Sequence, residues 1–238
     1  MMGRLLPDSV EVVDALGDLS GPLFPEEEAV VSRSVDKRRR EFVTGRLCAR
    51  RALTRLGVLP APLLPGPRGE PVWPKGVVGA ISHCEGYRVA AVARRTDIAS
   101  LGIDAEPAAR LPHGALEAVS LPEERARLRR YWPADPHIPW DRLLFSAKEA
   151  VYKAWFPLTG RTLEFEDALI VFDHGRRTFF ARLLVPAPPP LGGPGGGFTG
   201  RWAVHSGLVM TAVTVPASSL DGGRGVPEAL EDAASLPG

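Results

Sequence analysis

A helical pattern followed by several strand-like runs occurs twice in this chain of 238 residues, and this order limits the fold more than any other feature. The first long helix is expected from about Ser34, a plausible cap, to Leu56, with Gly57 as its stop. The second is expected from about Asp141 to Phe156. Because each helix precedes a group of strands, the pattern predicts an α+β fold made of two similar α/β subdomains, related by pseudo-two-fold symmetry.

The positions of apolar residues, proline and glycine define the remaining elements. Residues 57–76 are rich in proline and glycine and are expected to form an irregular loop, whereas Cys84–Gly86 is expected to be a tight turn. Two shorter helices are expected over 25–32 and 122–131. Strands are expected over 77–82, 87–94, 98–106, 168–173, 178–185, 201–205 and 208–215.

The same pattern divides the chain into three parts. Residues 1–107 are the expected N-terminal subdomain, residues 108–216 the C-terminal subdomain, and residues 217–238 a small, polar tail that we expect to be disordered. Ten of the twelve residues from 186 to 197 are proline or glycine. Such a segment cannot contribute to a core, and we expect it to be a mobile loop between two strands.

The composition is that of an ordinary globular protein, with 45% hydrophobic and 24% charged residues and a net charge of +1. Two cysteines, Cys48 and Cys84, cannot form a disulfide framework and favour a reducing compartment. No signal peptide is apparent, and no apolar run reaches the roughly eighteen residues of a membrane span. We therefore expect a cytoplasmic protein.

Three carboxylates and a lysine are placed where they could converge. Asp104 and Glu106 lie two residues apart on an expected strand and therefore point to the same face. Glu149 and Lys153 lie four apart on an expected helix and share one side of it. A solvated strand end and an exposed ion pair would also explain these residues. However, apolar residues surround the helix charges, so the helix should be buried and its charges should need partners.

Basic residues are concentrated on the first long helix, with eight of them against two acidic residues between Asp36 and Leu56. Arg38 and Arg46 lie about 80° apart around that helix, so both could reach one compact phosphate. A solvated face or a nucleic-acid patch is the alternative, although no aromatic residues alternate with the arginines as a stacking platform requires. Ser82-His83, after an apolar strand, could also donate to an anion, but such a histidine is more often structural.

The segment Gly102–Glu106 reads Gly-Ile-Asp-Ala-Glu, and Phe145–Lys153 reads Phe-Ser-Ala-Lys-Glu-Ala-Val-Tyr-Lys. Together they resemble the two defining motifs of the 4′-phosphopantetheinyl transferases, Gly-Ile/Val-Asp-x-Glu and Phe/Trp-Ser/Cys-x-Lys-Glu-Ala/Ser-x-x-Lys. The length and the basic helix resemble the surfactin-type branch, and the chain is particularly similar to actinobacterial enzymes related to enterobactin synthase component D. Supporting similarity lies in Arg39–Thr44, Gly79–Cys84 and Lys153–Leu158, and the resemblance spans roughly residues 20–215.

The resemblance implies an enzyme that transfers the 4′-phosphopantetheine arm of coenzyme A to a serine of an apo carrier protein, with release of 3′,5′-ADP. The implied partners are acyl, polyketide and peptidyl carrier proteins of fatty acid, polyketide and nonribosomal peptide biosynthesis, and neither nucleic acid nor a membrane is expected. The active site should lie at the interface of the two subdomains. We expect a monomer, because two fused halves could form internally the interface that smaller relatives form between subunits.

The resemblance also implies roles for individual residues. Asp104, Glu106 and Glu149 would bind Mg²⁺, or Mn²⁺ in its place, together with the pyrophosphate of coenzyme A. Glu149 would be the general base, directly or through a metal-bound water. Lys153 would hold the pyrophosphate and stabilise or protonate the departing phosphate. The implied contacts to coenzyme A phosphates are Arg38 and Arg46 at the 3′-phosphate, with Ser82, His83 and Lys148 as further contacts.

The chain departs from the family pattern at Pro65, where some relatives carry a lysine, and Arg68 is the nearest cation. An acidic carrier protein should dock on basic residues, and we expect these on the short helix after Pro122. An ordinary solvated helix would explain these arginines as well: Arg125, Arg127, Arg129 and Arg130.

Two other functions remain open from the residues alone. Another metal-dependent phosphotransferase or nucleotide hydrolase could use the same carboxylates without any carrier protein. A non-catalytic module could bind a nucleotide or an acidic protein through the basic helix.

Overall fold

The computed structural model describes residues 1–188, 191 and 196–221, and its elements alternate between helical and extended segments along the chain. The helical segments are η1 (Met2–Leu5), α1 (Pro25–Val31), α2 (Asp36–Arg55), α3 (Ala115–Val119), α4 (Pro122–Ala134), α5 (Trp140–Thr159), η2 (Phe165–Asp167) and α6 (Ser218–Asp221). The strands are β1 (Val10–Leu16), β2 (Val77–Cys84), β3 (Tyr87–Arg94), β4 (Ile98–Pro107), β5 (Ala168–Asp173), β6 (Thr178–Leu183), β7 (Gly197–His205) and β8 (Leu208–Pro216).

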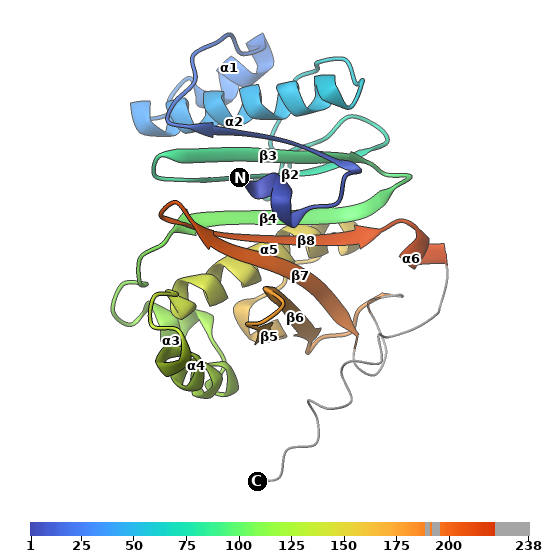
Figure 1. Ribbon diagram of the computed structural model, residues 1–238. Helices are drawn as coiled ribbons and strands as arrows, with labels where there is room; N and C mark the ends of the chain where they lie inside the picture. The colour runs from blue at the N-terminus through green and yellow to red at the C-terminus, as the bar shows by residue number, and fades with distance from the viewer. Residues whose placement is uncertain (189–190, 192–195, 222–238) are drawn as a thin grey trace.

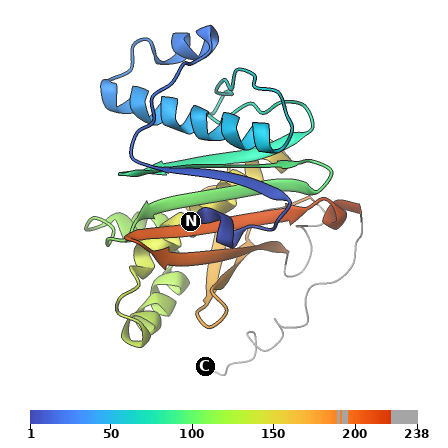
Figure 2. The same ribbon diagram turned by 45° about the horizontal axis from the view of Figure 1, so that its top comes forward.

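The strands form two antiparallel sheets that lie between the two long helices (Figure 1). The first sheet has the order β1-β3-β2 and the second the order β4-β8-β7-β6-β5. Figure 2 shows the same layers from a second direction, with α1 and α2 beyond the smaller sheet and α3 and α4 on the far side of the larger one. The α+β class predicted from the sequence is confirmed. The pseudo-two-fold relation between the halves stays a prediction.

Three groups of buried apolar residues hold these layers together. Cys48, Ala49 and Leu53 of α2 pack on Ala90 and Val92 of the smaller sheet. Between the sheets, apolar residues of β2 and β3 meet those of β4 and β8. The largest group joins α5 to the outer face of the five-stranded sheet and includes Trp140, Trp155 and Trp202. Each sheet is therefore covered on both faces, which is why several strands are apolar at nearly every position.

Most predicted elements are confirmed within a few residues. The segments missed were β1, the short helices α3 and α6, and the 3-10 helices η1 and η2. Val35, and not Ser34, precedes the first turn of α2, and no side chain caps it. Residues 218–221 form α6, so the expected tail does not begin at residue 217. The rest of that tail, and most of the proline- and glycine-rich segment 186–197, lie outside the described residues.

Strand pairing places β4 in the five-stranded sheet, whereas the predicted subdomain boundary at residue 107 stays a prediction. Each residue of β4 that forms a sheet pair has its partner on β8, for example Asp104 opposite Thr211. The change from one sheet to the other therefore falls between β3 and β4, before Ile98. As a result Asp104 and Glu106 belong to an edge strand of the five-stranded sheet, and β2 of the three-stranded sheet packs beside this strand.

A close backbone contact at Gly102 determines how β4 lies against α5. A Cβ atom added to Gly102 would approach the Ala150 carbonyl oxygen and lie 2.7 Å from the Ala154 nitrogen. Next to it, the Ser100 hydroxyl donates to the Ala154 carbonyl oxygen at 2.7 Å. Only glycine allows the strand and the helix to lie this close.

We predict that Gly102→Ala lowers the free energy of unfolding by about 2–4 kcal/mol, because a backbone atom rather than a flexible side chain would have to move. Chemical denaturation measures this change. The control is Gly175→Ala, whose added Cβ would meet its nearest atom at an ordinary 3.6 Å and which should change stability by less than about 0.5 kcal/mol. Equal effects of the two substitutions would contradict the packing argument.

Candidate active site

Asp104 is the centre of a buried polar cluster at the seam between the two sheets. Its carboxylate is 4% exposed, and its Oδ1 accepts hydrogen bonds from the Ser82 hydroxyl at 2.9 Å and from Lys153 Nζ at 2.8 Å. Ser82 Oγ in turn accepts the Ala105 amide at 3.1 Å. The structure thus joins β2, β4 and α5 through one carboxylate oxygen.

The second oxygen of Asp104, Oδ2, is buried without a hydrogen-bond partner among the described residues. A buried carboxylate oxygen without a donor is costly, so an absent ligand is the simplest explanation. Glu149 lies on α5 one turn before Lys153. Burial raises the pKa of Glu149, and the negative charge of Asp104 raises it further, although Lys153 acts in the opposite direction.

Glu106 is held by an arginine that the sequence did not indicate. Arg142 Nη1 lies 2.9 Å from Glu106 Oε2, and the rest of its guanidinium donates to the carbonyl oxygens of Ala109 and Arg110. Burial and the charge of Asp104 raise the pKa of Glu106, while Arg142 lowers it. An ion pair between residues far apart in sequence has no local pattern, which explains why Arg142 was missed.

Asp104, Glu106 and Glu149 are the carboxylates that could hold a divalent cation. No three His, Cys, Asp or Glu side chains of the described part of the chain lie close enough together to form a ready cation cage. Even so, Asp104 carries an oxygen without a partner, and its charge raises the pKa of both neighbouring carboxyls. Carboxylate oxygens are the ligands that Mg²⁺ takes, usually one or two at a time with waters and phosphates completing the shell. The ligand types therefore suit a magnesium ion, whereas its binding by Asp104, Glu106 and Glu149 together stays a prediction.

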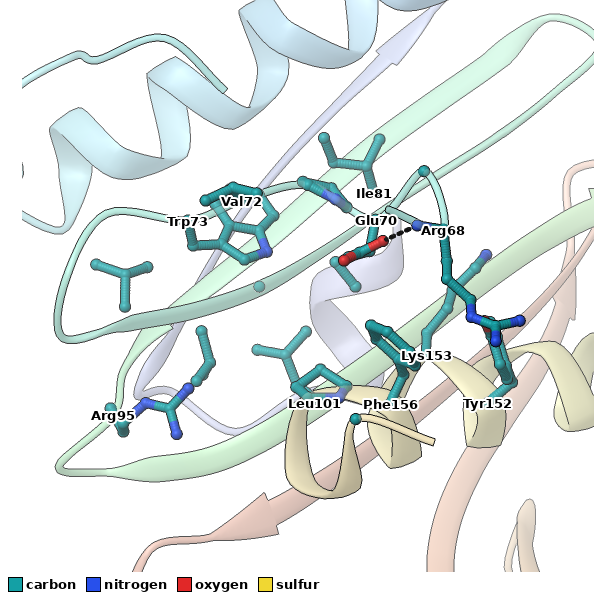
Figure 3. Close-up of a pocket in the computed structure, with 18 residues that line it drawn as sticks. Arg68, Glu70, Val72, Trp73, Ile81, Arg95, Leu101, Tyr152, Lys153 and Phe156 are labelled. Atoms are coloured by element: carbon teal, nitrogen blue, oxygen red, sulfur yellow. Dashed lines mark hydrogen bonds between the residues drawn. The ribbon is translucent and has the colours of Figure 1, made fainter. Parts of the chain in front are cut away.

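Lys153 also lines a cavity of about 550 Å³ between the loop 65–73, the smaller sheet and the end of α5 (Figure 3). Figure 3 shows Arg68 and Glu70 of the loop on one side and Tyr152, Lys153 and Phe156 of α5 on the other. The Arg68 amide donates to Glu70 Oε2 at 2.9 Å, which folds the loop back on itself. Apolar side chains line much of the remainder: Val72, Trp73, Val77, Val78, Ile81 and Leu101.

A second cavity, of about 300 Å³, adjoins the first, since Gly69, Pro71 and Ile81 line both. Arg38, Arg46 and His83 line this second cavity, as the spacing on the helix predicted for the two arginines. Arg38 Nη1 lies 3.3 Å from His83 Nε2. Burial and the nearby positive charges of Arg38 and Lys153 lower the pKa of His83, and only Glu41 opposes them. An anion in this cavity would relieve that repulsion.

Arg46 is a buried residue, and burial lowers its pKa to about 10. Its Nε donates to the Leu63 carbonyl oxygen at 2.6 Å, and its charge lies 4.2 Å above the Phe42 ring. Among the described residues this Nε contact is the hydrogen bond that Arg46 makes, and its terminal nitrogens have no protein partner. The bidentate end of Arg46 is therefore available to a ligand.

Two candidate residues have protein partners that the sequence did not reveal. Ser82 binds Asp104 and the Ala105 amide, so its hydroxyl organises the carboxylate in this structure. Lys148 is buried and lies 2.8 Å from Glu124 Oε2 and 2.5 Å from the Phe165 carbonyl oxygen. Its contact with coenzyme A stays a prediction, but the structure gives it a clear role in fixing α4 on α5.

Comparisons with known proteins show the family to which this chain belongs. Residues 26–93 match the family model described as the 4′-phosphopantetheinyl transferase N-terminal domain, and residues 100–190 match that of the 4′-phosphopantetheinyl transferase superfamily. The chain is 55% identical to 4′-phosphopantetheinyl transferase Svp of Streptomyces mobaraensis, over 91% of this chain and 90% of the relative. The chain belongs to the 4′-phosphopantetheinyl transferase superfamily.

Other relatives extend the similarity within this superfamily. The chain is 54% identical to 4′-phosphopantetheinyl transferase PptT of Mycobacterium tuberculosis over 81% of this chain and 86% of the relative. It is 36% identical to enterobactin synthase component D of Salmonella typhi over about half of each protein. Membership of the phosphopantetheinyl transferase superfamily is thus confirmed, whereas the surfactin-type branch stays a prediction. In the described residues no helix is both long and apolar enough to span a membrane.

The raised pKa of Glu149 predicts a pH-dependent stability difference in metal-free protein. Ionised Glu149 costs folding free energy once the pH exceeds 4.5, the ordinary value for glutamate, because the folded state favours the protonated form. Glu149→Gln should therefore raise the free energy of unfolding at pH 7, and the gain should vanish as the pH falls below about 4. Urea denaturation in the presence of a chelator measures this gain.

The control for this prediction is Glu85→Gln in the exposed turn between β2 and β3, which should give no such pH-dependent gain. Added Mg²⁺ should stabilise the wild type more than Glu149→Gln, because a ligand that binds the folded state shifts the equilibrium towards it. A Glu149→Gln protein that is less stable than the wild type at pH 7 without metal would contradict the assignment.

Proposed function

We propose that Asp104, Glu149 and Lys153 are the catalytic residues of this phosphopantetheinyl transferase, and that coenzyme A lies across the two adjoining cavities. The transfer moves the 4′-phosphopantetheine arm of coenzyme A to a serine hydroxyl of an apo carrier protein. Membership of the superfamily gives the reaction, whereas the residue roles, the metal and the choice of carriers are proposals. The observation that carries the residue roles is the Asp104–Lys153 ion pair. Asp104 Oδ2 is buried without a partner among the described residues, and Lys153 lines the larger cavity, which adjoins the cavity that contains Arg38 and Arg46.

The two cavities match the charge distribution of coenzyme A. Its 3′-phosphate is the compact anion that Arg38, Arg46 and His83 would bind, since the charges of the two arginines repel each other and favour a dianion between them. Its pyrophosphate would then lie towards Lys153, which lines the larger cavity. Arg68, on the loop above that cavity, is the remaining cation within reach of the phosphates.

The chemical step forms one phosphorus–oxygen bond and breaks another. The serine oxygen attacks the phosphorus that carries the pantetheine, the bond to the adjacent phosphate breaks, and 3′,5′-ADP leaves. Glu149 accepts the serine proton as the general base. Lys153, oriented by Asp104, stabilises the negative charge that develops on the departing phosphate.

As the cation we propose Mg²⁺, which Asp104, Glu106 and Glu149 would hold. When bound, it would neutralise charge on the pyrophosphate. Glu106 would have to share or exchange its contact with Arg142 to take part.

We predict that Glu149→Gln lowers the transfer rate by about 10²–10⁴-fold, because the general base is lost. Coenzyme A should still bind, since the arginine cavity is unchanged. The assay incubates protein, coenzyme A and Mg²⁺ with apo carrier proteins and follows the added mass of the arm on the carrier. Glu166→Gln, an exposed neighbour on η2, is the control and should transfer normally.

Several outcomes of this assay would contradict the proposal. Full transfer by Glu149→Gln would remove its role as base. Absence of any mass shift on fatty-acid, polyketide and peptide-synthetase carriers with the wild type would contradict carrier modification itself. Turnover of a nucleotide without any carrier would favour a hydrolase in its place.

Carrier docking is proposed on the basic side of α4. Arg129 and Arg130 are exposed and Arg127 is half-buried, while Arg125 donates to Ser120 and is less available. Helix α4 is firmly attached to the α5 helix of the active site, because Glu124 pairs with Lys148 and accepts the Ile170 amide. A carrier bound to α4 would therefore have a fixed position relative to Glu149 and Lys153.

We predict that Arg127→Glu with Arg129→Glu raises the KM for an acidic carrier roughly tenfold and leaves the KM for coenzyme A unchanged. Steady-state kinetics with each substrate varied in turn measures both constants. The control reverses two exposed strand arginines, Arg182 and Arg201, and should change neither. If both constants rise together in the α4 variant, the docking assignment is wrong.

A further inference from the structure

Glu27 is a fully buried glutamate that the proposed reaction does not use. It lies in the first turn of α1, is 0% exposed, and comes from a segment that contributes no residue to the chemistry. A buried carboxylate persists when it is paired and hydrogen-bonded, so its partners indicate its purpose.

Those partners connect Glu27 to the arginine cavity. Oε2 accepts Arg50 Nη1 at 2.6 Å and the Phe24 amide at 3.0 Å. Oε1 accepts the Leu63 amide at 2.9 Å. Leu63 is itself fully buried, and its carbonyl oxygen accepts Arg46 Nε at 2.6 Å. Glu27 and Arg46 therefore bind the amide and the carbonyl of the same residue, and Glu27 fixes the loop that orients this guanidinium.

The electrostatics of Arg46 agree with this connection. Burial lowers its pKa, and the charges of Arg38 and Arg50 lower it further, whereas the charge of Glu27 is the one that favours the ionised guanidinium. With Nε committed to Leu63, the two terminal nitrogens keep a fixed direction.

We propose that Glu27 is a positioning residue for Arg46. By fixing the backbone of Leu63, it sets the affinity of the site for the 3′-phosphate of coenzyme A. The inference rests on the proposed function, in which Arg46 binds that phosphate. A purely structural role for Glu27, as a cap of α1 and a partner of Arg50, is the alternative that the experiment must separate.

The test compares coenzyme A with 3′-dephospho-coenzyme A in the transfer assay. Wild-type protein should prefer coenzyme A, and Glu27→Gln should reduce this preference in kcat/KM about tenfold through the KM for coenzyme A, with kcat nearly unchanged. Activity with the dephosphorylated substrate should not change. The matched control is Glu28→Gln on the same helix, whose carboxylate pairs with Arg39 at the surface and has no contact with Leu63.

A double-mutant cycle with Arg46→Met makes the test specific. Arg46→Met alone should remove most of the preference, and adding Glu27→Gln to it should have no further effect. Should Glu27→Gln not fold, Glu27→Asp takes its place, because it keeps the charge but is too short to hold both Arg50 and the Leu63 amide.

The outcomes distinguish the proposals. Equal losses by Glu27→Gln on both substrates, or additivity with Arg46→Met, would overturn the positioning role and leave the site intact. Loss of the preference for coenzyme A in Arg46→Met but not in either Glu27 variant would also overturn the positioning role of Glu27. A normal preference in Arg46→Met would instead overturn the 3′-phosphate assignment, and a wild type inactive on every carrier would overturn the proposed function.

Discussion

The contact between strand β4 and helix α5 at Gly102 determines the rest of the active site. Because no side chain separates the two backbones there, Asp104 and Lys153 lie 2.8 Å apart, although they come from different elements. A larger residue at this position would move the strand away from the helix and lengthen that contact. Gly102 of the first motif therefore allows the close approach of strand and helix, and Asp104 supplies the charge that pairs with Lys153.

The candidate site combines positive and negative groups that are both destabilising when no ligand is bound. Asp104 has a buried oxygen without a partner, and Arg38, Arg46 and His83 share one small cavity. A substrate that carries phosphates together with a cation would satisfy both groups at once. Active sites commonly retain such unfavourable groups, because ligand binding compensates for them and more stable arrangements would bind less well.

The sequence predicted the fold class, most element positions and a few of the charged residues that line the cavities, because hydrophobic periodicity, helical spacing and short motifs carry that information locally. It could not predict that β4 pairs with β8, since register between distant strands leaves no local signal. The same reason applies to Arg142, which holds Glu106 from 36 residues away, and to the burial of Lys148 against Glu124. Residue types indicated the chemistry, and only the tertiary structure indicated which charges are already paired.

The position of β4 at the edge of its sheet has a consequence for self-association. An edge strand exposes backbone amides that can recruit a strand of another molecule, and proteins avoid this by covering or capping them. Here the Ser82 hydroxyl accepts the Ala105 amide while it donates to Asp104. One small side chain thus orients the carboxylate and also satisfies a backbone donor at this edge, which is buried beside β2.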